Sequence, residues 1–134
     1  MKSYLGVIFA LTLVGCATPY QSVGTTGGLS YSQFDEKVFE VSFSGNIYTS
    51  VDQARDFVKL KGAELCLESG YSFYNVLRSE AHSSSVIKEP SGLTWETSMP
   101  SAKLKLECVN SKQPDARSFD AQIVSSEMKS KYNL

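Results

Sequence analysis

The 134-residue chain has very few of the residue types on which metal binding and acid–base chemistry usually depend. It contains one histidine, three cysteines and one tryptophan. No Cys-x-x-Cys pair or clustered His/Cys spacing is present, so we predict neither a metal site nor a cofactor. A Gly-x-Ser-x-Gly elbow is also missing, and the glycine-rich stretch at 24–28 lacks a P-loop lysine. The common signatures of hydrolases and nucleotide-binding proteins are therefore excluded.

The sequence also lacks an excess of positive charge and a long apolar run. Its 13 basic and 14 acidic residues give a net charge of −1, which argues against a nucleic-acid partner because phosphates require a basic surface. The apolar run from Tyr4 to Val14 is shorter than the roughly 20 residues that a membrane-spanning helix needs. A short apolar run that follows Met1-Lys2 is instead typical of a secretory signal peptide.

The end of this run, Leu13-Val14-Gly15-Cys16, resembles the lipobox of bacterial lipoproteins. The resemblance implies that residues 1–15 are a signal peptide and that Cys16 becomes the lipidated first residue. Two or more acyl chains hold a protein firmly in a membrane. Because no aspartate follows Cys16, the resemblance implies an outer-membrane protein that faces the periplasm. We expect residues 16–34, rich in Gly, Ser and Thr, to form a flexible tether before a folded domain at 35–134.

The first half of the expected domain has clear periodicity. Lys37 to Ser44 alternates between apolar and polar residues, which predicts a half-buried strand. Ser50 and Gln53 form a capping-box pattern, and an apolar stripe at helical spacing follows from Val51 to about Ser69. Gly70 suits the left-handed position at a helix C-terminus.

The second half has a weaker pattern. We predict a strand at Tyr71–Arg78, an exposed loop at Ser79–Gly92, a strand at Leu93–Ser98 and a turn at Met99–Ala102. A strand at Lys103–Val109 and a helix from about Ser118 complete the chain. The sequence thus predicts one small α+β domain in the order β-α-β-β-β-α, with an antiparallel or mixed sheet of about four strands and two helices on one face.

Cys66 falls on the apolar stripe of the predicted helix, and Cys108 falls on the apolar face of the last strand. Both side chains should point into the helix–sheet interface. In an exported protein a disulfide between them would persist. The alternative is a pair of free buried thiols that pack as small hydrophobic groups.

The segment that links the first strand to the helix contains Asn46, Tyr48, Thr49 and Ser50. Free backbone N–H groups at a helix N-terminus can bind an anion or a polar ligand group, which makes these four residues a candidate ligand site. A turn plus a helix cap explains the same residue types, because Asn, Gly and Ser are favoured there for backbone reasons.

Three segments resemble a family of small Gram-negative envelope lipoproteins: Cys16–Gln21 (CATPYQ), Gly27-Gly28 and Phe43–Ser50 (FSGNIYTS). That family has no established activity, so the resemblance implies a location and a domain layout but no mechanism. We therefore predict a non-enzymatic adaptor or binding module, with the membrane as one partner through Cys16 and an envelope protein as another. A small-ligand-binding or stress-related domain is the alternative. An envelope hydrolase using His82 and Ser83–Ser85 would need a polar pocket that the sequence does not reveal.

Overall fold

The computed structural model describes residues 19–22, 27–46, 48–87 and 96–134, which form a five-stranded antiparallel sheet and two helices. The elements in chain order are β1 (Gly28–Gln33), β2 (Val38–Ser44), α1 (Val51–Glu68), β3 (Phe73–Ile87), β4 (Glu96–Val109), β5 (Ser118–Asp120) and α2 (Ala121–Tyr132). In space the strands lie in the order β1-β2-β4-β3-β5. The predicted α+β class is confirmed, with five strands in place of about four.

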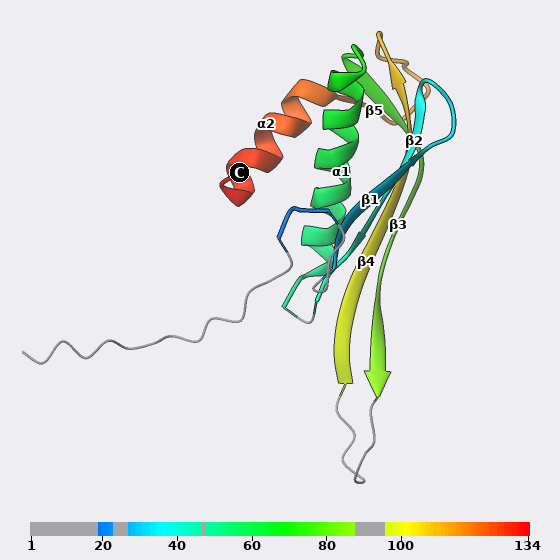
Figure 1. Cartoon of the computed structure of the whole chain (residues 1–134). Coiled ribbons are helices and arrows are strands. Elements are labelled where there is room, and N and C mark those ends of the chain that lie inside the picture. The colour runs from blue at the N-terminus through cyan, green and yellow to red at the C-terminus, as the bar shows by residue number, and fades with distance from the viewer. Residues whose placement is uncertain (1–18, 23–26, 47, 88–95) are drawn as a thin grey trace, which may run out of the picture.

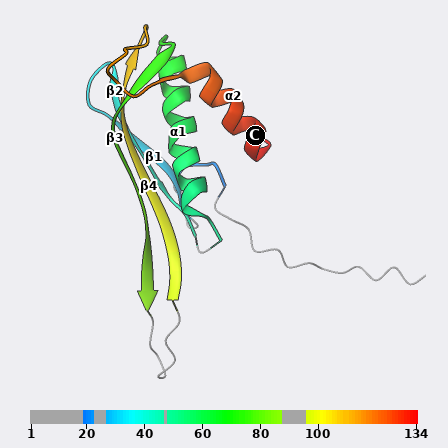
Figure 2. The same ribbon diagram turned by 180° about the vertical axis from the view of Figure 1, so that it is seen from behind.

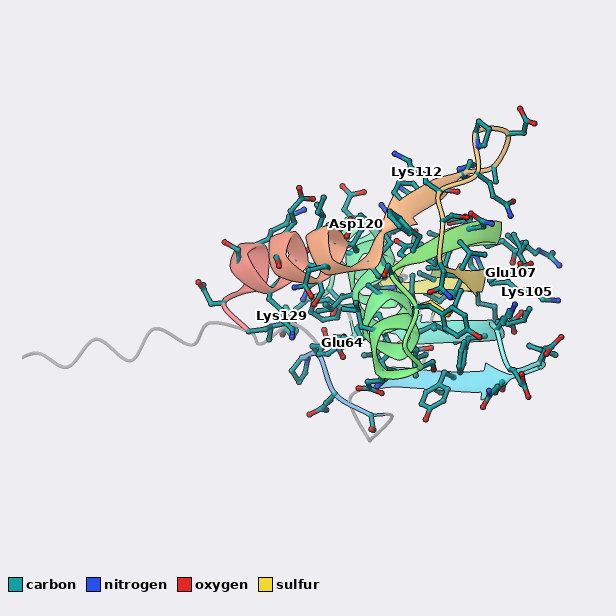
Figure 3. All side chains as sticks on the ribbon, turned by 90° about the horizontal axis from the view of Figure 1, so that it is seen from above. Glu64, Lys105, Glu107, Lys112, Asp120 and Lys129 are labelled. Carbon is teal, nitrogen blue, oxygen red and sulfur yellow. A yellow bond between two sulfur atoms is a disulfide. The ribbon has the colours of Figure 1, made fainter. Side chains whose placement is uncertain are left out.

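Both helices lie on the same side of the sheet, and α1 is the one that covers it (Figures 1 and 2). α1 contacts β2, β3 and β4, whereas α2 packs mainly against α1. The opposite face of the sheet is polar. Lys105 and Glu107 point away from the helices there (Figure 3). The core is therefore a single layer between α1 and the sheet.

The strongest sequence patterns correspond to the elements that build this core. On β2 the predicted alternation holds, since Phe39, Val41 and Phe43 are buried against α1. α1 begins where the capping box predicted, because the Ser50 hydroxyl accepts a hydrogen bond from the Gln53 N–H at 3.0 Å. The helix ends at Glu68, and Gly70 adopts the left-handed conformation with φ +86°.

Two predictions for the second half were wrong. β3 continues to Ile87, so residues 79–87 of the predicted loop form a strand paired with β4. This half of β3 is Ser-rich, and it is specified by its cross-strand partner instead of by an apolar face of its own. Beyond the pair Ser44–Ser101 at the end of β2, β3 and β4 form a two-stranded ribbon that extends past the other strands (Figure 1).

The predicted turn at Met99–Ala102 is also absent, because β4 runs through it as one strand that includes Pro100. The carbonyl of Pro100 accepts a hydrogen bond from the Gly45 N–H at 2.9 Å, on the β2 side of the strand. In an antiparallel strand the nitrogen and carbonyl of one residue point to the same side. The missing proline N–H therefore removes nothing from the β3–β4 ladder, which explains why a strand tolerates Pro100.

The boundaries at the two ends of the domain also differ from the prediction. β1 pairs in full register with β2, so Gly28–Gln33 belong to the sheet and not to the tether assigned to residues 16–34. At the other end Ser118–Asp120 form β5, and α2 begins at Ala121, capped by the Asp120 carboxylate, which accepts from the Ile123 N–H at 3.0 Å. Residues 93–95 of the predicted third strand lie outside the described residues.

Candidate functional site

The candidate corner after β2 is held together by bonds among its own polar groups. The Asn46 side-chain oxygen accepts from the Tyr48 N–H at 3.0 Å and from the Thr49 hydroxyl at 3.1 Å. The Asn46 carbonyl accepts from the Thr49 N–H at 3.1 Å. Ser50 caps α1 as described above. Ile47, between them, lies outside the described residues.

These contacts explain the residue types of the corner by local folding. Thr49 is buried, and a Cβ added at Gly45 would lie 2.6 Å from the Thr49 Cβ, so the tight approach requires glycine. Tyr48 is 59% exposed and is the one large side chain of the corner that the structure places in solvent. The geometry is that of a turn followed by a helix cap. A ligand at Asn46, Tyr48, Thr49 and Ser50 stays a prediction that no contact in the structure tests.

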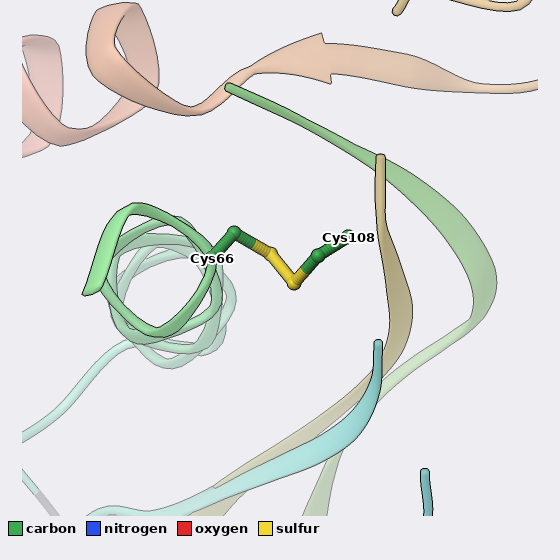
Figure 4. The surroundings of a disulfide bond; sticks show 2 residues. All are labelled: Cys66 and Cys108. Atoms are coloured by element: carbon green, nitrogen blue, oxygen red, sulfur yellow. A yellow bond between two sulfur atoms is a disulfide. The ribbon is translucent and has the colours of Figure 1, made fainter. Parts of the chain in front are cut away.

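Cys66 on α1 and Cys108 on β4 form a disulfide with an S–S distance of 2.05 Å (Figure 4). Both residues are fully buried. The bond ties the covering helix to the central strand of the sheet, as their positions on the two apolar faces predicted. Its role here is structural, because a buried disulfide is inaccessible to a thiol partner.

His82 lies on the polar face of the sheet, and not in the loop that the sequence predicted. Its Nε2 atom is 3.1 Å from the Ser101 hydroxyl, its cross-strand partner, and both side chains are at least partly exposed to solvent. Glu80, two residues away on the same face, forms an ion pair with Arg78. A hydrolytic triad needs a carboxylate that orients the histidine. Among the described residues, the Glu80 carboxylate pairs with Arg78 and makes no hydrogen bond or ion pair with His82.

Tyr20, from the expected tether, is docked on the covering helix α1. Its hydroxyl donates a hydrogen bond to the Glu64 carboxylate at 2.9 Å, and its ring meets Phe57 edge-on with centroids 5.3 Å apart. Burial, together with the hydrogen bond to Glu64, raises the pKa of the Tyr20 hydroxyl above its ordinary value. The sequence analysis missed this contact, since an isolated tyrosine in a Gly/Ser/Thr-rich segment gives no periodic signal.

A groove of about 450 Å³ lies beside this docked segment, between β1 and α1. Tyr20, Leu29 and Tyr31 give it apolar walls, and Lys61 of α1 supplies one positive charge. The Lys61 ammonium lies 5.3 Å from the centroid of the Tyr31 ring, a cation–π contact. Sequence reasoning missed this groove because its walls come from segments that lie far apart in the chain.

Asp56 is a second residue that the sequence analysis missed. It is buried on α1, and its carboxylate accepts from the Lys131 ammonium at 2.7 Å and from the Tyr132 hydroxyl at 2.6 Å. Burial, together with the bond to Asp56, raises the pKa of Tyr132, and the same carboxylate raises the pKa of Lys131. An acid next to Phe57 on an apolar stripe was the available signal. These contacts fix α2 on α1.

Within the described ranges, no group of three or more His, Cys, Asp or Glu side chains is arranged to hold a metal ion. No helix in this part of the chain is both long and apolar enough to cross a bilayer. Cys16, the predicted lipidation site, lies outside the described residues. Comparisons of the chain with protein-family models, curated proteins and solved structures gave no match. Any function must therefore be argued from the residues themselves.

Proposed function

We propose that the chain is an exported lipoprotein, anchored through lipid on Cys16 in the outer membrane and facing the periplasm, and that its domain is a non-enzymatic adaptor or binding module. The anchor is supported by the order of residues in Leu13-Val14-Gly15-Cys16 behind a short apolar run. A mature chain from Cys16 has 13 − 1 = 12 basic and 14 acidic residues, because only Lys2 is removed from the charges. Its net charge of −2 does not favour nucleic acid as a partner.

The observation that carries the proposal is the docking of Tyr20 on α1. Only residues 17–19 separate Tyr20 from Cys16. Four residue steps of an extended chain span at most about 14 Å. A lipid on Cys16 would therefore hold the folded domain directly against the bilayer surface. The composition had predicted a flexible tether at residues 16–34 instead. A protein held so close to the membrane suits a partner that is itself at the membrane.

The exposed geometry favours binding over chemistry. The groove between β1 and α1 and the ribbon formed by the ends of β3 and β4 both offer surfaces to a partner. On the polar face of the sheet, a hollow of about 120 Å³ is lined by charged residues of both signs, in which Glu40 lies opposite Lys105 and Glu80 lies opposite Lys103; the lining residues are Glu40, Arg78, Glu80, Lys103 and Lys105. Opposed charges on neighbouring strands stabilise a solvated sheet face. That face accordingly gives no reason to propose a charged substrate.

In-cell cross-linking of the tagged, lipidated protein tests the proposal, followed by mass spectrometry of the attached chains. The matched control is the same domain with Cys16→Ala behind a non-lipoprotein signal, so that it reaches the periplasm without an anchor. We expect one dominant envelope protein to be attached to the lipidated form and to be lost in the control. Lipidated protein that attaches to no specific envelope protein would contradict the adaptor role.

A further inference from the structure

β1 forms one edge of the sheet, and among the described residues only Gln21 and Ser22 pair with its outer side. The Leu29 N–H donates to the Gln21 carbonyl at 2.7 Å, on the side that faces away from β2. In an antiparallel strand the outward-pointing residues alternate, so the backbone N–H and C=O groups of Tyr31 and Gln33 point the same way as those of Leu29. Gln21 and Ser22 cover the first of these positions with one parallel bridge, Ser22–Leu29. Among the described residues no further strand pairs beyond it.

This edge lacks the features by which proteins usually protect an exposed strand. Charged residues, proline or a bulge normally prevent an edge from pairing with another chain. β1 (GLSYSQ) has neither charge nor proline, and its register with β2 is unbroken. The opposite edge is different, because β5 covers the start of β3 and a bulge follows between Val76 and Arg78. β1 thus lacks these features over its whole length, whereas the opposite edge has a covering strand, a bulge and charged residues up to Glu80 of β3.

The groove described above runs along this open edge. Its lining comes from the edge strand, from the Tyr20–Ser22 segment and from Lys61 of α1. Tyr31, whose side chain is 53% exposed, stands at the groove with Lys61 beside its ring. A strand added to β1 would place alternate side chains into the groove, because side chains alternate across a strand. Backbone pairing would supply affinity, and the groove would supply selectivity.

We propose that the β1 edge binds an extended peptide segment of a partner protein as an added strand. The segment would pair with the outward groups of Tyr31 and Gln33, beyond the position covered by Gln21 and Ser22, and would place an apolar side chain against Tyr31 and an acidic group beside Lys61. The chain's own Gln21–Ser22 segment already pairs in this manner at the start of the same edge. Lys61 determines the choice of an acidic group, since among the described residues that line the groove it is the one with a charge. This inference rests on the proposed role as a binding module and names the site and the class of partner.

The first step of the test is selection of linear peptides from a random library against the lipidated chain in detergent micelles. Enriched peptides should combine an acidic residue with an apolar residue at alternate positions. N-methylation should then be scanned along the best peptide. Within the stretch that pairs with Tyr31 and Gln33, methyl groups at every second position should abolish binding and the others should not, because alternate N–H groups of an added strand face β1. Loss at all positions or at none would overturn strand addition.

Two variants locate the binding on the protein. Gln33→Pro removes one outward N–H of β1, which an edge strand tolerates, and should weaken the best peptide about tenfold. Gln33→Ala keeps that N–H and is the matched control, which should bind as the parent does. Lys61→Glu should weaken acidic peptides further, while Lys61→Arg should not. A peptide whose affinity is unchanged in both Gln33→Pro and Lys61→Glu would refute the assignment of this edge.

The outcome separates this inference from the proposed function. If cross-linking in cells captures an envelope partner and no linear peptide binds the edge, the strand-addition inference is wrong and the adaptor role stands. If peptides bind as described but the lipidated protein captures no envelope partner, the edge is confirmed as a peptide site and the adaptor role is contradicted.

Discussion

Replacing Cys66 and Cys108 together by alanine should lower the free energy of unfolding by about 4 kcal/mol. The two residues are 42 positions apart in the chain. In the chain-entropy model, a loop of this length removes roughly 13 cal/mol/K from the unfolded ensemble, which corresponds to the stated energy near 25 °C. Both side chains are fully buried, so alanine avoids placing an unpaired polar group in the core.

The assay is urea denaturation followed by circular dichroism at about 222 nm, which reports the two helices. Both the reference and the variant should carry Cys16→Ala, so that no third thiol can form a wrong pair. For a domain of this size the melting temperature should fall by roughly 15 °C. Reduction of the reference protein with dithiothreitol under denaturing conditions should reproduce the variant's curve. The unfolded variant is less constrained, so its dependence on urea should also become steeper.

A loss of less than about 1 kcal/mol with an unchanged urea dependence would refute this reasoning. It would mean that the cross-link between α1 and β4 hardly restricts the unfolded chain. Residual structure in the denatured state is the physical alternative that such a result would support.

Three further predictions concern the contacts that hold the outer segments in place. Tyr20→Phe should lower the free energy of unfolding by about 1 kcal/mol, because it removes the hydrogen bond to Glu64, and Tyr20→Ala should lower it further, because it also removes the contact with Phe57. In both variants the Leu29 amide, which bonds to the Gln21 carbonyl, should exchange its hydrogen faster. Protection of this amide equal to the parent's would contradict the docking of Tyr20. Asp56→Ala should lower the free energy of unfolding by about 2–3 kcal/mol in chemical denaturation, because the Tyr132 hydroxyl loses its acceptor. Lys131→Met should lower it much less, because the Lys131 side chain is 57% exposed. The free energy of unfolding should fall as the pH rises above about 10. In the folded state the pKa values of Tyr20, Tyr74 and Tyr132 lie above the ordinary value of 10.0, so these tyrosines lose their protons first in the unfolded state. Tyr20→Phe should show a smaller alkaline loss in the same denaturation series, and an equal loss would exclude Tyr20 as a contributor.

Local pattern was sufficient to predict the elements at the centre of the fold. β2 and α1 each bury a continuous apolar stripe, and the N-cap of α1 is encoded by Ser50 and Gln53, three residues apart. Gly62 within α1 shows the limit of that information. A Cβ there would lie 2.3 Å from the Leu106 side chain, so the glycine reflects the close approach of α1 to β4. Nothing next to Gly62 in the sequence indicates its partner.

The elements that the sequence analysis missed are specified by partners distant in the chain. β1 and the outer half of β3 are rich in serine, and they form strands because β2 and β4 pair with them. β4 contains Pro100, which predicts a turn when only its neighbours in the sequence are considered. The candidate corner was predictable, because its bonds join residues within three or four positions. The groove was not, because it depends on Tyr20 and Tyr31 meeting α1.

We propose above that Cys16 carries lipid and holds the domain at the membrane. Metabolic labelling with an alkyne fatty acid, together with the mass of the mature N-terminal peptide, tests it most directly. We expect a labelled chain that begins at Cys16 and carries the mass of its acyl groups, with no label on Cys16→Ala. An unlabelled parent chain, or a peptide that runs unbroken from Leu13 through Thr18, would contradict it.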